Sequence, residues 1–350
     1  MRIGLYGMPT AGKTHILNQL DFIEVLSGSN LLHEICPEFD FQDEHGKNRT
    51  REDLAKMLQS KDTFIMDGHY SFGNQIAFTE MDGQLYDAIL YLYISSDIVE
   101  KRMKKSEKNS KYVSYNIEKW QLNEIESLRD YCHENNKDFY VIDNPPDNFF
   151  DDVTEVIEFI KAIVKGFSCE RFARRCVAQI LENAESDVIT LFDGDKTITN
   201  EDSSHVTFGY TTHIYDGNFY TGFQSWKQAR EFKSYNLDDL NSIPVTYNEK
   251  VCRVLDKASF ILTSGHEKVW ETIADHLSVK SFVGIEMASD TKFFITKMLQ
   301  EAGKTVIAYG DGMNDFYMLK QADEGYLVPK ADGSISRSLK GRDLGGITIV

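Results

Sequence analysis

The segment GMPTAGKT, residues 7–14, has the residue types and spacing of a phosphate cradle. Its glycines let backbone N–H groups turn inward, and the helical stretch that follows at 15–20 and beyond adds partial positive charge. Lys13 can reach the β- and γ-phosphates of a nucleotide, and the Thr14 hydroxyl can bind Mg²⁺. The alternative is a glycine turn without a ligand. We predict that ATP is held by Gly7, Thr10, Ala11, Gly12, Lys13 and Thr14.

A second segment, DGDKT at residues 193–197, follows the apolar run 187–192. Two carboxylates two residues apart can divide the work of cleaving a phosphoester. Asp193 can attack phosphorus as a nucleophile, while Asp195 can protonate the leaving oxygen and later activate water. This segment therefore predicts phosphate chemistry in the second half of the chain as well.

Apolar runs alternate with helical patterns around both segments. Parallel sheets covered on both faces show this alternation, because their strands are buried between helices. In the first half we predict strands at residues 2–6, 63–66, 88–94 and 139–142, and helices at 97–105, 117–134 and 151–163. In the second half we predict a helix at 169–183 and strands at 187–192, 258–262 and 305–309. The predicted fold class is α/β, with two doubly wound parallel-sheet domains at residues 1–165 and 166–350.

The composition is that of a folded protein with an acidic surface. The 350 residues include 38 basic and 55 acidic ones, which gives a net charge of −17. This charge argues against long nucleic acid or an anionic membrane as a partner. Hydrophobic residues make up 41% of the chain, enough for packed cores. The 5 cysteines include no CxxC pair, which argues against a zinc site or a disulfide framework.

The chain opens with MRIGLYGMPTAGKT, in which a short apolar run passes directly into glycine-rich sequence. A secretory signal peptide needs a longer apolar core and a small-residue cleavage site. No stretch approaches the roughly 18 uninterrupted apolar residues of a membrane span. We therefore expect a soluble, cytoplasmic protein.

The first 165 residues resemble small-molecule and nucleoside-monophosphate kinases of the P-loop class. The resemblance rests on GMPTAGKT, on MDGHY at residues 66–70 and on YISSDIVEKRMKKSEK at residues 93–108. It implies that Asp67 is a second acidic group near Mg²⁺, although Asp67-Gly68 can equally start a turn.

The same resemblance implies a mobile lid over the basic run at residues 101–111. Arg102 would clamp phosphate there, but it is the only arginine in the run, and lysine cannot offer the same planar fork. A solvated helical face explains the run equally well. Related kinases also place an acidic residue near the acceptor hydroxyl, for which Asp40 is the candidate. The alternative for Asp40 is a solvated acidic loop.

Residues 185–330 resemble the haloacid dehalogenase (HAD) superfamily of Mg²⁺ phosphohydrolases, and in particular its phosphoserine-phosphatase-like branch. The resemblance rests on four ordered pieces, DGDKT, ILTSGH at 261–266, SDTKFF at 289–294 and YGDGMND at 309–315. It implies catalytic roles for Asp193, Asp195, Ser264 and Lys292. In these roles Asp193 is the nucleophile, Asp195 the acid and base, Ser264 a phosphate ligand and Lys292 a neutralising charge. Thr263 competes with Ser264, and Lys297 with Lys292.

The resemblance also implies a Mg²⁺ site formed by Asp193, the backbone carbonyl of Asp195, and Asp311, with Asp315 as a further metal-side carboxylate. Four converging carboxylates without a cation would repel one another, so the charges point the same way. Oxygen-only ligands and a phosphate substrate select Mg²⁺ over zinc. The alternative is a set of unrelated acidic turns at strand ends.

The resemblance places a helical cap at about residues 199–257. Relatives often have an acidic residue facing the substrate at the position of Asp202, and we also predict substrate contacts from Gly265 and Arg230. Nine aromatic residues lie between residues 208 and 235. They can stack on a ring of the substrate or form the core of the cap, and the second role is the commoner one.

Together these features predict a bifunctional kinase and phosphatase of small phosphorylated metabolites, with nucleotide-like compounds among the candidates. The cofactors would be ATP and Mg²⁺. One alternative is a polynucleotide 5′-kinase/3′-phosphatase, which the net charge of −17 disfavours. The other is a phosphatase regulated by nucleotide binding to the P-loop domain, without phosphoryl transfer.

Overall fold

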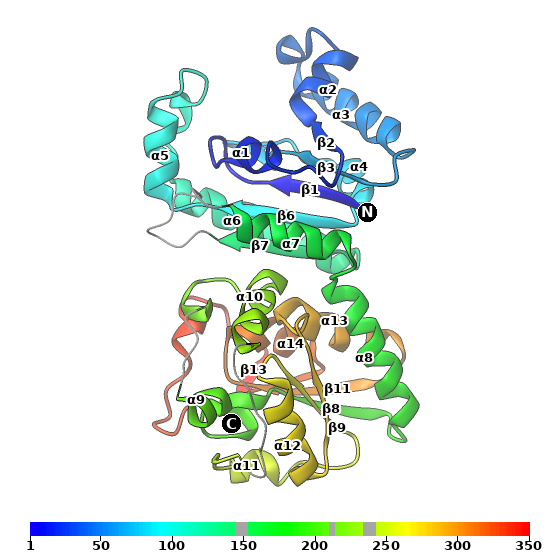
Figure 1. Ribbon diagram of the computed structural model, residues 1–350, viewed down its shortest axis with the longest axis vertical. Coiled ribbons are helices and arrows are strands. Elements are labelled where there is room, and N and C mark those ends of the chain that lie inside the picture. The colour runs from blue at the N-terminus through cyan, green and yellow to red at the C-terminus, as the bar shows by residue number, and fades with distance from the viewer. Residues whose placement is uncertain (144–152, 210–213, 234–242) are drawn as a thin grey trace. The chain divides into compact units, whose positions relative to one another are not determined.

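The structure is a computed structural model that describes residues 1–143, 153–209, 214–233 and 243–350. The chain forms two compact units, Met1–Phe167 and Ser168–Val350, each built on its own parallel sheet (Figure 1). Two of the aromatic residues predicted for the cap, Tyr210 and Tyr235, lie outside the described residues, as do the first two residues of the helix predicted at 151–163.

The first unit has a 5-stranded parallel sheet with strand order β2-β3-β1-β6-β7. The strands are β1 Arg2–Tyr6, β2 Val25–Ser27, β3 Phe64–Asp67, β6 Ala88–Tyr93 and β7 Asp138–Asp143. Four of them match predicted strands. The strand β2 was not predicted, because its 3 partly exposed residues do not form a recognisable apolar run. The phosphate cradle follows β1, and Asp67 ends the neighbouring β3, so both lie at the carboxyl edge of the sheet.

Helices and a short hairpin complete this unit. They are α1 Lys13–Leu17, α2 Gly28–Ile35, α3 Glu44–Leu58, α4 Glu80–Leu85, α5 Ser96–Lys104, α6 Ile117–Glu134, α7 Thr154–Val164 and the hairpin strands β4 Ser71–Phe72 and β5 Gln75–Ile76. The expectation that α1 continues past Leu20 was wrong. The Gln19 and Leu20 amides bond to carbonyls three residues back, at 3.0 and 3.1 Å, and this tighter turn ends the helix.

The second unit has a 6-stranded parallel sheet with strand order β10-β9-β8-β11-β12-β13. The strands are β8 Val188–Phe192, β9 Ser259–Thr263, β10 Lys280–Val283, β11 Thr305–Gly310, β12 Glu324–Leu327 and β13 Ile347–Ile349. The predicted strands are the three at the centre. The missed strands β10, β12 and β13 lie toward the edges, where short and partly exposed runs give a weaker pattern.

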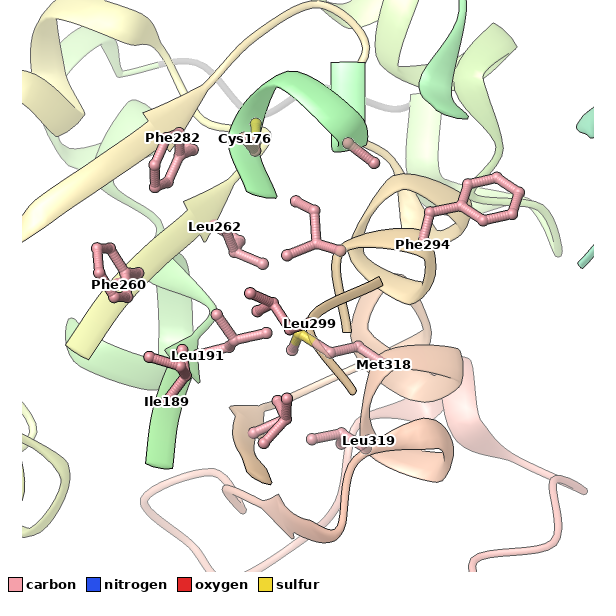
Figure 2. Close-up of a cluster of buried hydrophobic side chains, with 14 of the residues drawn as sticks. Cys176, Ile189, Leu191, Phe260, Leu262, Phe282, Phe294, Leu299, Met318 and Leu319 are labelled. Atoms are coloured by element: carbon pink, nitrogen blue, oxygen red, sulfur yellow. The ribbon is translucent and has the colours of Figure 1, made fainter. Parts of the chain in front are cut away.

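One face of this sheet is covered by α8 Cys169–Asn183, α13 Ser289–Glu301 and α14 Met313–Gln321, which enclose the hydrophobic cluster of Figure 2. Side chains alternate along the strands, as a pleated backbone requires. Ile189 and Leu191 point into this cluster, whereas Phe192 belongs to the cluster on the opposite face. Trp270, from α12 Glu267–Leu277, is wholly buried in that second cluster.

The insertion between β8 and β9 contributes three short helices among its described residues. They are α9 Ser203–Phe208, α10 Gly222–Phe232 and α11 Glu249–Cys252. An antiparallel bridge between Thr199 and Tyr247 joins the two ends of the insertion. Across the part of the chain that the structure describes, no helix has the length and apolar character needed to cross a bilayer.

Candidate functional site

The carboxylate centre of the second unit is organised by one buried lysine. Lys292 Nζ donates to Asp193 Oδ1 at 2.6 Å and to Asp315 Oδ1 at 2.7 Å. The Lys292 side chain, which α13 carries, is completely buried. Lys297, the alternative to Lys292, pairs instead with Glu301 one turn along the same helix, at 4.0 Å. The structure therefore brings Lys292, and not Lys297, to Asp193.

Asp311 completes this centre from the end of β11. Carboxylate oxygens of Asp193, Asp311 and Asp315 lie within 4.8 Å of one another. Asp315 Oδ2 also accepts hydrogen bonds from the backbone N–H groups of Asp311 and Gly312, at 3.1 and 3.3 Å, so Asp315 shapes the loop that carries Asp311. The donor set consists only of oxygen, which fits Mg²⁺.

The pKa values show how crowded these charges are. Burial, together with the charges of Asp193 and Asp315, raises the pKa of Asp311 well above its ordinary value. Burial and the charge of Asp193 raise the pKa of Asp315 to about 6. Burial alone would lower the pKa of Lys292, but the two carboxylates outweigh it and raise that pKa. Negative charge is thus in excess around the centre, and a divalent cation would relieve it.

Asp195 lies on the tight turn after β8. Lys196, the next residue, has a left-handed backbone with φ 62°, which turns the chain sharply. Asp195 Oδ1 accepts a hydrogen bond from the backbone N–H of Ser203 at 2.7 Å. Burial and the charge of Asp202 raise the pKa of Asp195 to about 7. A carboxyl group with that pKa can both give and take a proton near neutral pH.

Ser264 lies in the loop after β9, opposite Asn314, whose Nδ2 donates to Ser264 Oγ at 3.4 Å. Tyr215 of the cap lies near Ser264: burial raises the pKa of the Tyr215 hydroxyl, and the Ser264 side chain opposes that rise. Thr263, the alternative to Ser264, is buried and its Oγ1 accepts a hydrogen bond from the Gly265 N–H at 3.1 Å. The Thr263 hydroxyl therefore shapes the turn, which leaves Ser264 as the residue beside the centre.

Trp270 packs beneath the two loops that carry Asp193 and Ser264. A Cβ on Gly194 would lie 2.5 Å from Trp270 Cζ2, and a Cβ on Gly265 would lie 2.3 Å from Trp270 Nε1. Only glycine fits at either position while the indole is there. Sequence reasoning missed Trp270 and the role of Tyr215. A tryptophan in a helical pattern and one tyrosine among nine aromatics carry no local mark of proximity to a site.

The predicted substrate residues occupy two different settings. Asp202 Oδ2 lies 3.4 Å from Lys196 Nζ, next to Asp195. Arg230 is exposed, and its guanidinium lies 4.5 Å from the centre of the Trp226 ring in α10.

The phosphate cradle of the first unit has the backbone that its glycines predict. Gly7 and Gly12 have positive φ angles of 147° and 108°, and Thr10 also adopts a positive φ of 69°. The Thr10 hydroxyl oxygen is buried and has no hydrogen-bond partner among the described residues. Lys13 Nζ donates to the carbonyls of Gly7 at 2.6 Å and Met8 at 3.2 Å, at the centre of the loop. A buried ammonium and an unpaired buried hydroxyl fit a phosphate ligand.

Asp67, His69 and Arg102 interact with the lysine or the loop of this cradle. Burial lowers the pKa of Lys13 to about 8, while the charge of Asp67 opposes the shift. The Lys13 Nζ also lies 3.4 Å from Nδ1 of His69. Burial and the charge of Lys13 hold the pKa of His69 well below its ordinary value. Arg102 Nη1 donates to the carbonyls of Thr10 and Ala11, at 3.1 and 3.2 Å, so Arg102 braces the loop from α5.

The remaining predicted residues of this unit lie as follows. Thr14 is exposed in α1. Asp67 Oδ1 accepts a hydrogen bond from the Gly28 N–H at 2.9 Å, which ties the end of β3 to the start of α2. Asp40 is 64% exposed and pairs with His33 Nε2 at 3.2 Å. The structure therefore joins Asp67 to the surroundings of Lys13, while Asp40 is engaged with the surface of α2.

No family model and no curated protein matches the chain. Similar solved structures include shikimate kinase from Acinetobacter baumannii in complex with shikimate, at 18% identity and a TM-score of 0.34, covering 46% of this chain and 93% of that one. Shikimate kinase from Bacteroides thetaiotaomicron has 13% identity and a TM-score of 0.34, covering 47% and 98%. A HAD family hydrolase from Salmonella enterica serovar Typhi has 18% identity and a TM-score of 0.27, covering 45% and 71%.

Proposed function

We propose that the chain is a bifunctional enzyme of small phosphorylated metabolites. The second unit hydrolyses phosphomonoesters through an aspartyl-phosphate, and the first transfers the γ-phosphoryl group of ATP. The observation that carries the proposal is the pairing of Lys292 with both Asp193 and Asp315, with Asp195 on the adjoining turn. Such an arrangement holds a nucleophile, a countercharge and an acid around one phosphate.

In the phosphatase step, a carboxylate oxygen of Asp193 attacks phosphorus and the bond to the leaving oxygen breaks. Asp195 gives its proton to that leaving oxygen, so a neutral alcohol departs. Asp195 then takes a proton from the water that attacks the aspartyl-phosphate, which releases inorganic phosphate and restores Asp193. Lys292 and Ser264 hold the phosphoryl oxygens. Mg²⁺ bound by Asp193, Asp311 and the Asp195 carbonyl, with Asp315 beside it, would neutralise their charge.

In the kinase step, the cradle and Lys13 would hold the phosphates of ATP, while Arg102 keeps the loop in shape. Thr14 and Asp67 are the residues that would hold Mg²⁺ there. Asp40 stays the predicted partner of the acceptor hydroxyl.

The variant Asp193→Asn tests the phosphatase assignment, because an amide cannot form the aspartyl-phosphate. We expect hydrolysis of p-nitrophenyl phosphate to fall at least about a thousandfold while ATP binding is unchanged. The matched variant Lys13→Ala should weaken ATP binding and leave hydrolysis in place. Turnover retained by Asp193→Asn would exclude the covalent route.

Nucleotide sensing without phosphoryl transfer is a second candidate for the first unit. It is favoured by Arg102, which spends its Nη1 donor on loop carbonyls and is the only arginine of the basic run at 101–111. ATP binding without phosphoryl transfer to any of a broad panel of acceptors, combined with a change in phosphatase rate, would support this candidate over the kinase.

A further inference from the structure

The cap and the loop after β9 bring neutral polar side chains near Asp195 and Ser264. The Tyr215 hydroxyl, whose pKa the nearby Ser264 side chain influences, donates to Gln228 Oε1 at 3.1 Å. Ser203, at the start of α9, is fully buried beside Asp195. His266 follows Gly265, whose added Cβ would lie 3.2 Å from Asp195 Oδ2. Hydroxyl, amide and imidazole side chains thus lie on segments next to Asp195 and Ser264.

Two of these groups still have a free hydrogen-bonding atom. Ser203 Oγ and His266 Nδ1 are buried, and neither has a hydrogen-bond partner among the described residues. The His266 ring lies between Phe208 and Phe232 of the cap, at centroid distances of 5.3 and 5.4 Å, and burial lowers its pKa. A buried polar atom without a partner is costly, so hydroxyl groups on a ligand would satisfy both atoms.

Among the described residues, the two ammonium groups that interact with the carboxylates of the centre, Lys292 and Lys196, are both already paired. Lys292 is committed to Asp193 and Asp315, and Lys196 is paired with Asp202 at 3.4 Å. The carboxylates that interact here outnumber these two ammonium groups; they belong to Asp193, Asp195, Asp202, Asp311 and Asp315. A bound Mg²⁺ would offset two of the three excess negative charges. A carboxylate or second phosphate on the leaving group would then face net negative charge.

We propose that the phosphatase site takes monoesters whose leaving group is a neutral, hydroxyl-bearing alcohol. This inference rests on the proposed phosphatase function and narrows its substrate class. Ser203, His266, Tyr215 and Gln228 recognise hydroxyl groups, and the paired Lys196 and Asp202 exclude a second anion by leaving it no countercharge. Free sugars and nucleosides share this chemistry, and substrates of both kinds belong in the test.

The test compares the full chain, with Mg²⁺, on glycerol 3-phosphate and 3-phosphoglycerate. These esters differ only in a hydroxymethyl against a carboxylate group. We expect kcat/KM to be at least tenfold higher for glycerol 3-phosphate, and equal or reversed values would overturn the inference. Ribose 5-phosphate and a nucleoside 5′-monophosphate, measured alongside, distinguish a free sugar from a nucleoside. Preference for ribose 1,5-bisphosphate over ribose 5-phosphate would also overturn it.

The variant Asp202→Asn should reduce the ratio of kcat/KM for glycerol 3-phosphate to kcat/KM for 3-phosphoglycerate at least fivefold. It frees the Lys196 ammonium for the carboxylate of 3-phosphoglycerate, and asparagine can still cap α9 as Asp202 does. Arg253→Ala, at an exposed arginine paired with Glu249 on α11, is the matched control and should leave the ratio unchanged. A ratio that is unchanged in Asp202→Asn, or that changes when Arg230 is substituted, would contradict the charge argument.

Hydrolysis of p-nitrophenyl phosphate separates the two ways of failing. If the chain with Mg²⁺ does not hydrolyse it, the proposed phosphatase function itself fails. If the chain hydrolyses it but prefers 3-phosphoglycerate to glycerol 3-phosphate, only the present inference fails.

Discussion

At the scale of single residues, both candidate sites depend on a buried lysine. Lys292 lies between two carboxylates, whereas Lys13 lies among backbone carbonyls. The difference explains their opposite pKa shifts. Two negative charges more than offset the burial of Lys292, while the dipoles and the more distant Asp67 around Lys13 do not offset its burial.

Replacing Lys292 by methionine tests the role of this buried lysine. The variant leaves Asp193 and Asp315 buried without their countercharge, so we expect it to lose about 3–5 kcal/mol of unfolding free energy. The phosphatase rate should fall at least about a thousandfold. Urea denaturation and p-nitrophenyl phosphate hydrolysis measure the two effects. The control Lys297→Met breaks the half-buried pair with Glu301, which at 4.0 Å is long, and should cost about 1 kcal/mol. Equal losses in the two variants would refute the role of Lys292.

Lys13 predicts a pH dependence of ATP binding. Its pKa is lowered to about 8, so the ammonium cation is present below that pH and is lost as the pH rises through it. ATP affinity should be flat from pH 6 to 7 and then fall by about tenfold per pH unit above 8. Titration calorimetry across this range measures it, with Lys56→Ala, an exposed lysine of α3, as the control. An affinity that is constant up to pH 10 would contradict the lowered pKa.

At the scale of elements, the second site depends on the contact between α12 and the loops after β8 and β9. Trp270 of α12 leaves room for nothing larger than glycine at positions 194 and 265. The indole therefore sets how closely the nucleophile loop and the phosphate loop approach each other. Neither loop contains this information alone.

A pair of variants tests that contact. Gly265→Ala should lower kcat at least about a hundredfold, because its Cβ would lie 2.3 Å from Trp270 Nε1 and displace the loop. Trp270→Leu added to Gly265→Ala removes the indole, and we expect kcat to be at least tenfold higher than in Gly265→Ala alone. The cavity that the indole leaves should lower the stability. Steady-state kinetics and thermal unfolding follow both effects. If the effects of the two substitutions simply add, the indole does not control the loop.

At the scale of the whole molecule, two compact units with separate cores should respond separately to their ligands. Calorimetry should show two unfolding transitions. ATP should raise the unfolding temperature of one transition, because it binds the folded first unit, and Lys13→Ala should abolish that shift. In nucleotide-free protein, Mg²⁺ should raise the other, and Asp311→Asn should abolish that shift. A single transition that moves with both ligands would show that the two units unfold together.

Much of the fold and of the second site could be predicted from the sequence. The central strands are long buried runs, and Asp193, Ser264 and Asp311 each follow such a run, so pattern and motif agree there. The strands at or next to the sheet edges, β2, β10, β12 and β13, were missed because short, partly exposed strands have little pattern of their own. The early end of α1 was missed because the switch to a three-residue hydrogen-bonding pattern is not apparent from residue types.

The sequence by itself determined which residue types stand at the carboxyl ends of the strands, and so the class of chemistry that we propose. Only the tertiary structure showed that Ser264 and Lys292, rather than Thr263 and Lys297, lie beside the carboxylate centre. The members of each pair carry the same functional group and differ in where their side chains point. The tertiary structure also brought Trp270 and Tyr215 next to residues of the candidate site, although both come from segments whose patterns indicate ordinary packing. Proximity across the fold is a property of the packed chain, and local residue spacing does not contain it.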